Sequence, residues 1–351
     1  MTLISYLSRT HFAEAAIEDA LPEELGQVSR ALLLVDDDDA ANLAASRVQD
    51  ALTGISLSVV RARSRVAPAV MIARLLEALT DIQSNTLIAV GGPEAIGLAR
   101  LCAERARRSG AHLKVVAVPA GISDFGLSRR VRSSQGQYLA CPRPDCIVAD
   151  PTVLKPVESR RLAASAMEVL VHAVEAYASP GYNPPADAMA ADAVRRITHW
   201  LPRALADPSN SEALRELLAS ALTAGLALEK AFGGVDAFAV PIHAELGSGL
   251  LHGAVHGPLM AAMAEFNGEA VGERYTTMAG YFANTDHRAH FSAEIGAFAR
   301  NVGMPATLRE IGVDRSQLGR LAEVAANDPA ALANPRRLTS GDCRRILEAA
   351  W

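Results

Sequence analysis

The sequence predicts a two-domain chain, with an α/β domain built on a parallel sheet at residues 1–155 and an all-α domain at residues 156–351. The length of 351 residues exceeds what one hydrophobic core usually organises. Over the first 150 residues, short apolar runs alternate with segments of helical period, as in a parallel sheet covered on both faces. Beyond Asp150 most segments have helical periodicity and few have strand signals.

In the first domain, buried parallel strands are expected where apolar runs are short and are followed by acids, glycine or proline. The expected strands are Ala31–Val35, Ile55–Ala62, Thr86–Val90, Leu113–Val118 and Cys146–Val148. Helices are expected at Asp39–Leu52, at Val70–Leu79 and from the Gly91-Gly92-Pro93 turn through Arg107.

The second domain is expected to consist of helices, the last of them capped by the segment Thr339-Ser340-Gly341-Asp342. The expected helices are Ser159–Ser179, Pro185–Ala206, Ser211–Phe232, Leu250–Phe266, Glu269–Thr285, Ser292–Val302, Thr307–Ile311, Arg315–Asn327 and Ser340–Trp351.

Charge and composition argue against several classes of protein. The 34 basic and 39 acidic side chains give a net charge of -5, which argues against binding nucleic acid through phosphate contacts. No apolar run approaches the roughly 20 residues that span a membrane, and the first residues lack the pattern of a signal peptide. We therefore expect a cytoplasmic protein that binds neither nucleic acid nor a membrane.

A glycine turn is the first candidate site. Gly91 and Gly92 follow a buried strand and open a helix, a junction that presents backbone N–H groups to phosphate. By local pattern alone, the two glycines more often form a tight turn between strand and helix that binds nothing.

Two groups of histidines and carboxylates form the next candidates. Glu168, His172 and Glu175 follow one face of a helix, where they could share a metal, relay a proton, or form only a solvated helix edge. His243, His252 and His256 fall within fourteen residues, and this clustering favours a functional role.

Five segments, taken in order, resemble the iron-containing alcohol dehydrogenase superfamily, and within it the maleylacetate reductase branch. They are LIAVGGPEAIGLARLCA, VVAVPAGISDFG, PDCIVADPTVLKPVE, SAMEVLVHAVEAYAS and GLLHGAVHGPLMAAMAEFN. The resemblance runs from about Phe12 to Trp351 and implies a dinucleotide-binding α/β domain, an all-helical catalytic domain and an active site in the cleft between them. It also implies NAD or NADP as cofactor, a small anionic substrate, a divalent metal and a homodimer.

Cofactor-binding residues are carried over by position. Gly91 and Gly92 match the pyrophosphate loop, Asp36 falls near the adenosine ribose, and Pro119 begins the loop beside the nicotinamide. Ser123 could partly replace hydroxyls that this loop otherwise carries.

Glu94 departs from the pattern of that loop. It would put a carboxylate where pyrophosphate lies, and two charges about 4 Å apart repel by about 4 kcal/mol at an effective dielectric constant near 20.

Catalytic and metal residues are carried over in the same way. Glu168 and His172 match the first two metal positions, and His252 matches a further one; together these three would be the metal ligands. His243 matches a nearby histidine, and the remaining metal histidine is replaced by Ala239. His172, His243, His252 and Glu168 are therefore the candidate catalytic residues.

Two activities are consistent with these residues. In the first, the chain reduces maleylacetate or a related unsaturated oxo-dicarboxylate with NADH or NADPH, as in the degradation of aromatic compounds. In the second, the fold no longer binds nicotinamide and performs hydration, elimination or isomerisation by acid–base catalysis. A third alternative is a catalytically silent relative that binds a metabolite or a partner subunit.

Overall fold

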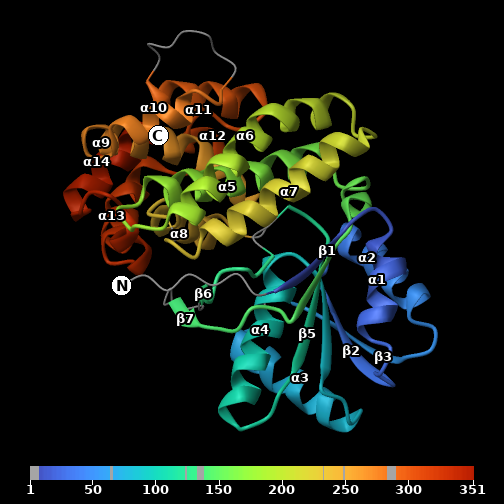
Figure 1. Cartoon of the computed structure of the whole chain (residues 1–351). Coiled ribbons are helices and arrows are strands. Elements are labelled where there is room, and N and C mark those ends of the chain that lie inside the picture. The colour runs from blue at the N-terminus through green and yellow to red at the C-terminus, as the bar shows by residue number, and fades with distance from the viewer. Residues whose placement is uncertain are drawn as a thin grey trace. The chain divides into compact units, whose positions relative to one another are not determined.

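The computed structural model describes residues 8–63, 66–122, 125–132, 138–231, 233–247, 250–282 and 290–351. These residues form two compact units, one ending at Val157 and the other beginning at Glu158. The first unit holds a parallel sheet with helices, and the described part of the second is helical, which confirms the predicted fold class (Figure 1).

The sheet of the α/β unit has six parallel strands in the order β1-β8-β5-β4-β2-β3. Their bounds are Arg9–Phe12 (β1), Arg30–Val35 (β2), Ser56–Arg61 (β3), Thr86–Gly91 (β4), Lys114–Pro119 (β5) and Cys146–Ala149 (β8). The interior strands β2, β4 and β5 are runs of buried apolar residues, as expected where helices cover both faces. A separate antiparallel pair joins β6 (Arg130–Arg132) and β7 (Tyr138–Ala140).

Strand order decides on which face each helix lies. The helices of this unit are α1 (Ala16–Glu24), α2 (Asp39–Ala51), α3 (Pro68–Asp81) and α4 (Pro93–Arg108). Right-handed crossovers put α1 and α2 on one face and α3 and α4 on the other, and each of these pairs packs together. The helices that follow the neighbouring strands β2 and β4 thus lie on opposite faces, which makes the carboxyl ends of these strands the topological switch point, where open α/β sheets bind ligands.

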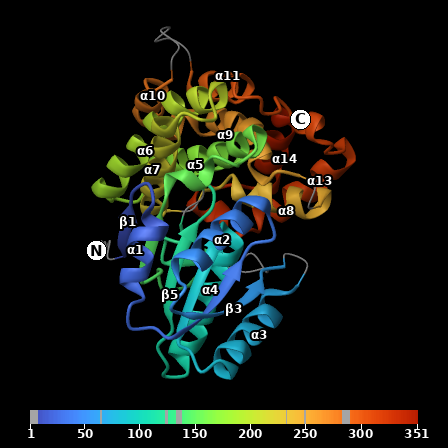
Figure 2. The same cartoon turned by 90° about the vertical axis from the view of Figure 1, so that its right-hand side faces the viewer.

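The second unit is built of helices around α5 (Ser159–Ala178), which is apolar on nearly every side. Helices α6, α7, α9 and α10 all pack against α5, which lies in the middle of this unit (Figure 2). The remaining elements are η1 (Pro151–Leu154, in the first unit), α6 (Pro184–Ala206), α7 (Ser211–Ala227), α8 (Asp236–Leu246), η2 (His252–Val255), α9 (His256–Val271), α10 (Glu273–Ala279), α11 (Phe291–Asn301), α12 (Leu308–Ile311), η3 (Arg315–Gln317), α13 (Leu318–Ala326), η4 (Pro329–Ala333) and α14 (Ser340–Ala350).

Several elements differ from the prediction. Strand β1, helix α1 and the β6–β7 pair were not expected, and β1 is a short edge strand whose letters RTHF lack an apolar run. Helix α8 was also missed, because it contains Pro241 and follows two glycines. The single helix expected at Leu250–Phe266 is divided into η2 and α9 at His256.

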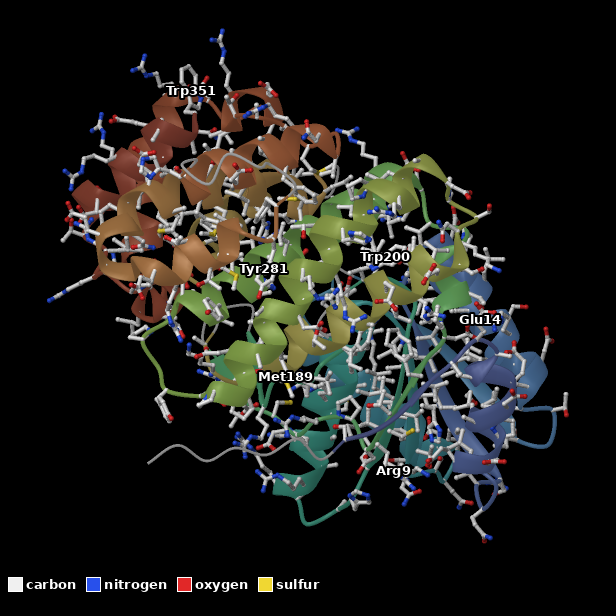
Figure 3. The ribbon with its side chains drawn as sticks, turned by 45° about the horizontal axis from the view of Figure 1, so that its top comes forward. Arg9, Glu14, Met189, Trp200, Tyr281 and Trp351 are labelled. Atoms are coloured by element: carbon white, nitrogen blue, oxygen red, sulfur yellow. The ribbon has the colours of Figure 1, made fainter. Side chains whose placement is uncertain are left out.

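The C-terminal residue is held in place by the helical unit. The indole Nε1 of Trp351 donates a 2.8 Å hydrogen bond to the carbonyl of Val313, and the guanidinium groups of Arg309 and Arg315 lie 5.4 and 5.3 Å from its ring (Figure 3). Among the described residues, no helix has the length and apolar character that crossing a bilayer requires.

The first prediction tests the packing of the sheet. Leu33 on β2 is fully buried, so Leu33→Ala should lower the free energy of unfolding by about 2–5 kcal/mol, because it removes apolar contact and leaves a cavity. Leu43 on α2 is 54% exposed, and Leu43→Ala should cost less than about 0.5 kcal/mol. Equal shifts of the two variants in urea unfolding would contradict the packing described for β2.

Candidate active site

The glycine turn follows β4 and opens α4, as the sequence predicts. Gly91 has a φ of +145°, and a Cβ at this position would lie 2.3 Å from Asp36 Oδ2. Only glycine allows so close an approach. The turn is therefore shaped around the side chain of Asp36, which follows β2 at the switch point.

The carboxylate of Asp36 accepts hydrogen bonds from the turn. Oδ2 accepts from the N–H of Gly92 at 2.6 Å, and Oδ1 accepts from the N–H of Ala95 at 2.9 Å. These are amides at the start of α4, where the helix dipole favours an anion. The chain's own carboxylate thus binds the amide of Gly92, which belongs to the predicted pyrophosphate loop, and the amide of Ala95, which was not predicted. The ribose contact predicted for Asp36 stays a prediction.

Burial and neighbouring acids affect the charge of Asp36. Loss of hydration raises its pKa to about 6, the charges of Glu94 and Asp38 act in the same direction, and the bonds from Gly92 and Ala95 oppose the rise. Partial loss of hydration and the charge of Asp37 raise the pKa of Glu94 as well. The amides that would bind phosphate are therefore surrounded by acidic side chains.

The other predicted cofactor residues are placed as follows. Pro119 ends β5 directly beside Gly91, and the next amide, that of Ala120, donates to the carbonyl of Gly91 at 2.9 Å. The strand end expected beside a nicotinamide therefore adjoins the glycine turn. Ser123 lies outside the described residues.

The helical unit brings four histidines into one string, in which His256 is buried and the other three are half-buried. Ring centroids lie 5.7 Å apart for His172 and His256, 5.0 Å for His256 and His252, and 5.3 Å for His252 and His243, and each pair meets edge to face. The rings come from α5, the start of α9, η2 and α8. His172, His243 and His252, all predicted as catalytic, are thus joined through His256.

A carboxylate that the sequence analysis missed lies at one end of this string. Asp236, the first residue of α8, is 7% exposed, and its Oδ1 lies 3.3 Å from His172 Nε2 and 3.5 Å from His256 Nε2. Burial alone would raise the pKa of Asp236, but His172 and His256 hold it well below its usual range. Burial alone would lower the pKa of His172, but Asp236 outweighs burial and raises it to about 10.

The remaining acids differ in their contacts. Glu175 is buried, and its Oε1 accepts from the N–H of Val235 at 2.8 Å, which fixes the start of α8. Burial raises the pKa of Glu175 to about 8, which favours its protonated form. Glu168 lies one turn before His172 on α5 and is half-buried.

Among the described residues, two groups bring three metal-ligand atoms within 4.8 Å of one another: His172, Asp236 and His256, and a second group of His11, Glu24 and Cys146. The predicted ligands Glu168, His172 and His252 are not such a group, so a metal on that set stays a prediction. Sequence reasoning could have found Asp236, because it is the one acid in the otherwise apolar segment between Gly233 and His243.

Comparison with known proteins identifies the family. Residues 162–351 match the C-terminal part of the Fe-containing alcohol dehydrogenase family, and residues 15–156 match iron-containing alcohol dehydrogenase. The chain therefore belongs to the iron-containing alcohol dehydrogenase family of oxidoreductases, near the maleylacetate reductase branch, as the sequence predicted.

Relatives over nearly the whole chain carry different activities. A 4-hydroxybutyrate dehydrogenase of Cupriavidus necator is 24% identical and covers 99% of both chains. Maleylacetate reductase 1 of Rhodococcus opacus is 24% identical over 94% of this chain and 90% of its own. A solved 1,3-propanediol oxidoreductase superposes with a TM-score of 0.86 at 22% identity over 100% of both chains, which shows the shared fold.

The titration of Asp36 gives a second prediction. Its pKa rises on folding from 3.8 to about 6. Between these pH values the folded protein binds more protons than the unfolded chain, so the free energy of unfolding falls as the pH rises. Asp36→Asn removes the titrating group but keeps an acceptor. The free energy of unfolding of the variant relative to the wild type should increase by up to about 3 kcal/mol between acidic and neutral pH.

Chemical unfolding of both proteins across this pH range measures the effect. Asp39→Asn, a substitution of an exposed acid three residues away, is the matched control. A difference for Asp36→Asn that does not change with pH would show that Asp36 is not buried against the turn.

A third prediction concerns how η2 holds His252 against α5. A Cβ at Gly253 would lie 1.8 Å from the carbonyl oxygen of Ala164, so Gly253→Ala should destabilise the helical unit by more than about 3 kcal/mol. Gly268 on α9 has no atom within 4 Å of the added carbon, and Gly268→Ala should stabilise by about 0.5–1 kcal/mol. Thermal unfolding that ranks the two variants in the opposite order would contradict the placement of η2.

Proposed function

We propose that the chain is an NADH- or NADPH-dependent reductase of a small anionic oxo compound, maleylacetate or a related unsaturated oxo-dicarboxylate. The observation that carries this proposal is the string of four histidines beside Asp236. Family membership supports hydride transfer, and maleylacetate reductases are among the relatives that match over most of the chain.

Reduction of an unsaturated oxo compound needs a hydride at one carbon and a proton at another. A bound nicotinamide would supply the hydride, and a positioned side chain would supply the proton. His252 is half-buried, and each of its ring neighbours, His243 and His256, is another imidazole. In this proposal His252 donates a proton to the substrate and is then reprotonated through the neighbouring imidazoles of the string.

The family name implies iron, and the helical unit has residues that fit a divalent metal. The Nε2 of His256 is buried, has no hydrogen-bond partner among the described residues, and faces Asp236. His172, Asp236 and His256 would hold the ion, which when bound would act as a Lewis acid toward the oxo group of the substrate. The protein's own part is to orient that group and to keep water from it.

The α/β unit supplies the turn for the cofactor. Gly91 permits close approach of a backbone, and the amides of Gly92 and Ala95 point toward an anion. For pyrophosphate to bind to these amides, Asp36 must release them, which reduces the affinity for the dinucleotide.

A small anionic substrate, a homodimer and a cytoplasmic location remain part of the proposal.

A second candidate function is favoured by the same turn. Because Asp36 satisfies the two amides and Glu94 adds a further carboxylate, the turn is a poor anion site. A chain of this fold without nicotinamide would use the histidine string for hydration, elimination or isomerisation. Cofactor binding distinguishes the two functions.

The cofactor prediction is tested by fluorescence titration with NADH and NADPH. We expect binding to the wild type, and Glu94→Gln should lower the dissociation constant roughly tenfold, because it removes a repelling charge worth at least about 1.4 kcal/mol. Glu77→Gln, at an exposed acid on α3, should change nothing. Failure of the wild type and of Glu94→Gln to bind either cofactor at millimolar concentration would favour the non-redox function.

The proton-donor prediction is tested by steady-state kinetics with maleylacetate. His252→Asn should lower kcat at least about 10²-fold, because the proton donor is lost, while NADH binding stays unchanged. His199→Asn, at an exposed histidine on α6, is the control. A kcat for His252→Asn within a few fold of the wild type would exclude His252 as the proton donor.

A further inference from the structure

Three side chains from three helices point their polar atoms at one place inside the helical unit. His172 comes from α5, Asp236 begins α8 and His256 begins α9. Asp236 Oδ1 lies 3.3 Å from His172 Nε2 and 3.5 Å from His256 Nε2, and the three ligand atoms all lie within 4.8 Å of one another.

The hydrogen bond made by His256 fixes which of its nitrogens carries hydrogen. Its Nδ1 lies 3.2 Å from the carbonyl oxygen of His252, and a carbonyl only accepts, so Nδ1–H is the donor. In the neutral ring the lone pair of Nε2 then faces Asp236. The charge of Asp236 Oδ1, 3.5 Å from this nitrogen in a buried place, is then balanced either by a proton on Nε2 or by a metal cation bound between the two atoms.

The polar atom that His256 Nε2 faces is Asp236 Oδ1, at 3.5 Å. The side chain is fully buried, and among the described residues this nitrogen has no hydrogen-bond partner. Metal-ligating histidines almost always donate their other ring N–H to a carboxylate, a backbone carbonyl or water, and His256 makes such a bond through Nδ1.

The distances fit the bonds of a transition metal. Metal–nitrogen and metal–carboxylate bonds are about 2.0–2.2 Å long, and tetrahedral geometry then places neighbouring ligand atoms about 3.4 Å apart. The separations of 3.3 and 3.5 Å from Asp236 Oδ1 agree with this value. Two imidazoles and one carboxylate are a donor set for Fe²⁺ or Zn²⁺ that leaves further positions open.

We propose that His172, Asp236 and His256 form a divalent transition-metal site in which neither Glu168 nor His252 is a ligand. The site differs from the set implied by sequence resemblance in two of its three members, and it does not depend on the reductase function. The side chain of His252 lies next to the site, and its backbone carbonyl orients His256.

The other group of ligand-type residues lacks these features. Glu24 already pairs with His11 at 2.9 Å and with Arg9 at 2.8 Å, so its charge is balanced. Burial raises the pKa of Cys146 to about 11, so its thiol does not ionise readily. Glu24 therefore belongs to an ion-pair network with Arg9 and His11 of the edge strand β1.

Metal binding is tested with Co²⁺, whose visible absorption reports coordination without any assay of activity. The metal-free wild type should bind one Co²⁺ per chain, and Asp236→Asn and His256→Asn should each weaken binding by roughly 100-fold or more, because each removes a ligand. Glu168→Gln and His252→Asn are the matched controls and should stay within about threefold. Circular dichroism verifies that each variant is folded.

A cysteine substitution shows directly whether a given position binds the metal, because a cysteine bound to cobalt has its own absorption band. His256→Cys should give a thiolate-to-cobalt charge-transfer band in the near ultraviolet, and His252→Cys should give none. Because Cys146 belongs to the other group of ligand-type residues, the spectrum of the cobalt-loaded wild type is the baseline for both variants.

Three results would overturn the proposal. The first is a folded wild type that binds no Co²⁺, which would mean that a protonated histidine alone balances Asp236. The second is loss of binding in Glu168→Gln and His252→Asn together with retention in His256→Asn. The third is a charge-transfer band in His252→Cys and not in His256→Cys. Failure of the NADH titration would leave all of these results unaffected.

Discussion

The buried carboxylate of Asp236 is the constraint on which the helical unit depends. A charge at 7% exposure must be balanced, and the two imidazoles that face it come from α5 and α9. Glu175 fixes the start of α8 through Val235, so that Asp236 meets those imidazoles. The charge of Asp236 thus links the starts of α8 and α9 to α5 and to the histidine string.

A second buried carboxylate governs the α/β unit. Asp36 lies at the switch point and satisfies two amides of the glycine turn, so the loop is held in shape without a ligand. Any anion that binds to the same amides must compete with Asp36. Each candidate site is therefore built around a buried acid. At the glycine turn an anionic ligand would compete with Asp36 for the two amides, and in the helical unit a metal ion would bind to Asp236 together with His172 and His256.

Much of the fold and part of the site could be predicted from the sequence. Interior strands such as β2 and β4 are continuous apolar runs, and the long helices α5–α7 have a clear period, because burial imposes these patterns locally. Edge strand β1 and helix α8 lack a local signal, since pairing with β8 and packing around Asp236 create them. The clustering of His243, His252 and His256 was visible, whereas the meeting of Asp236 with His172 was not, because 64 residues separate them.

The most direct test of this account is a crystal structure of the protein soaked with Zn²⁺ and measured at the zinc absorption edge. The account predicts one strong anomalous peak within about 2.3 Å of His172 Nε2, the Asp236 carboxylate and His256 Nε2. A map without a peak at Asp236, or a peak held by Glu168 and His252, would contradict it.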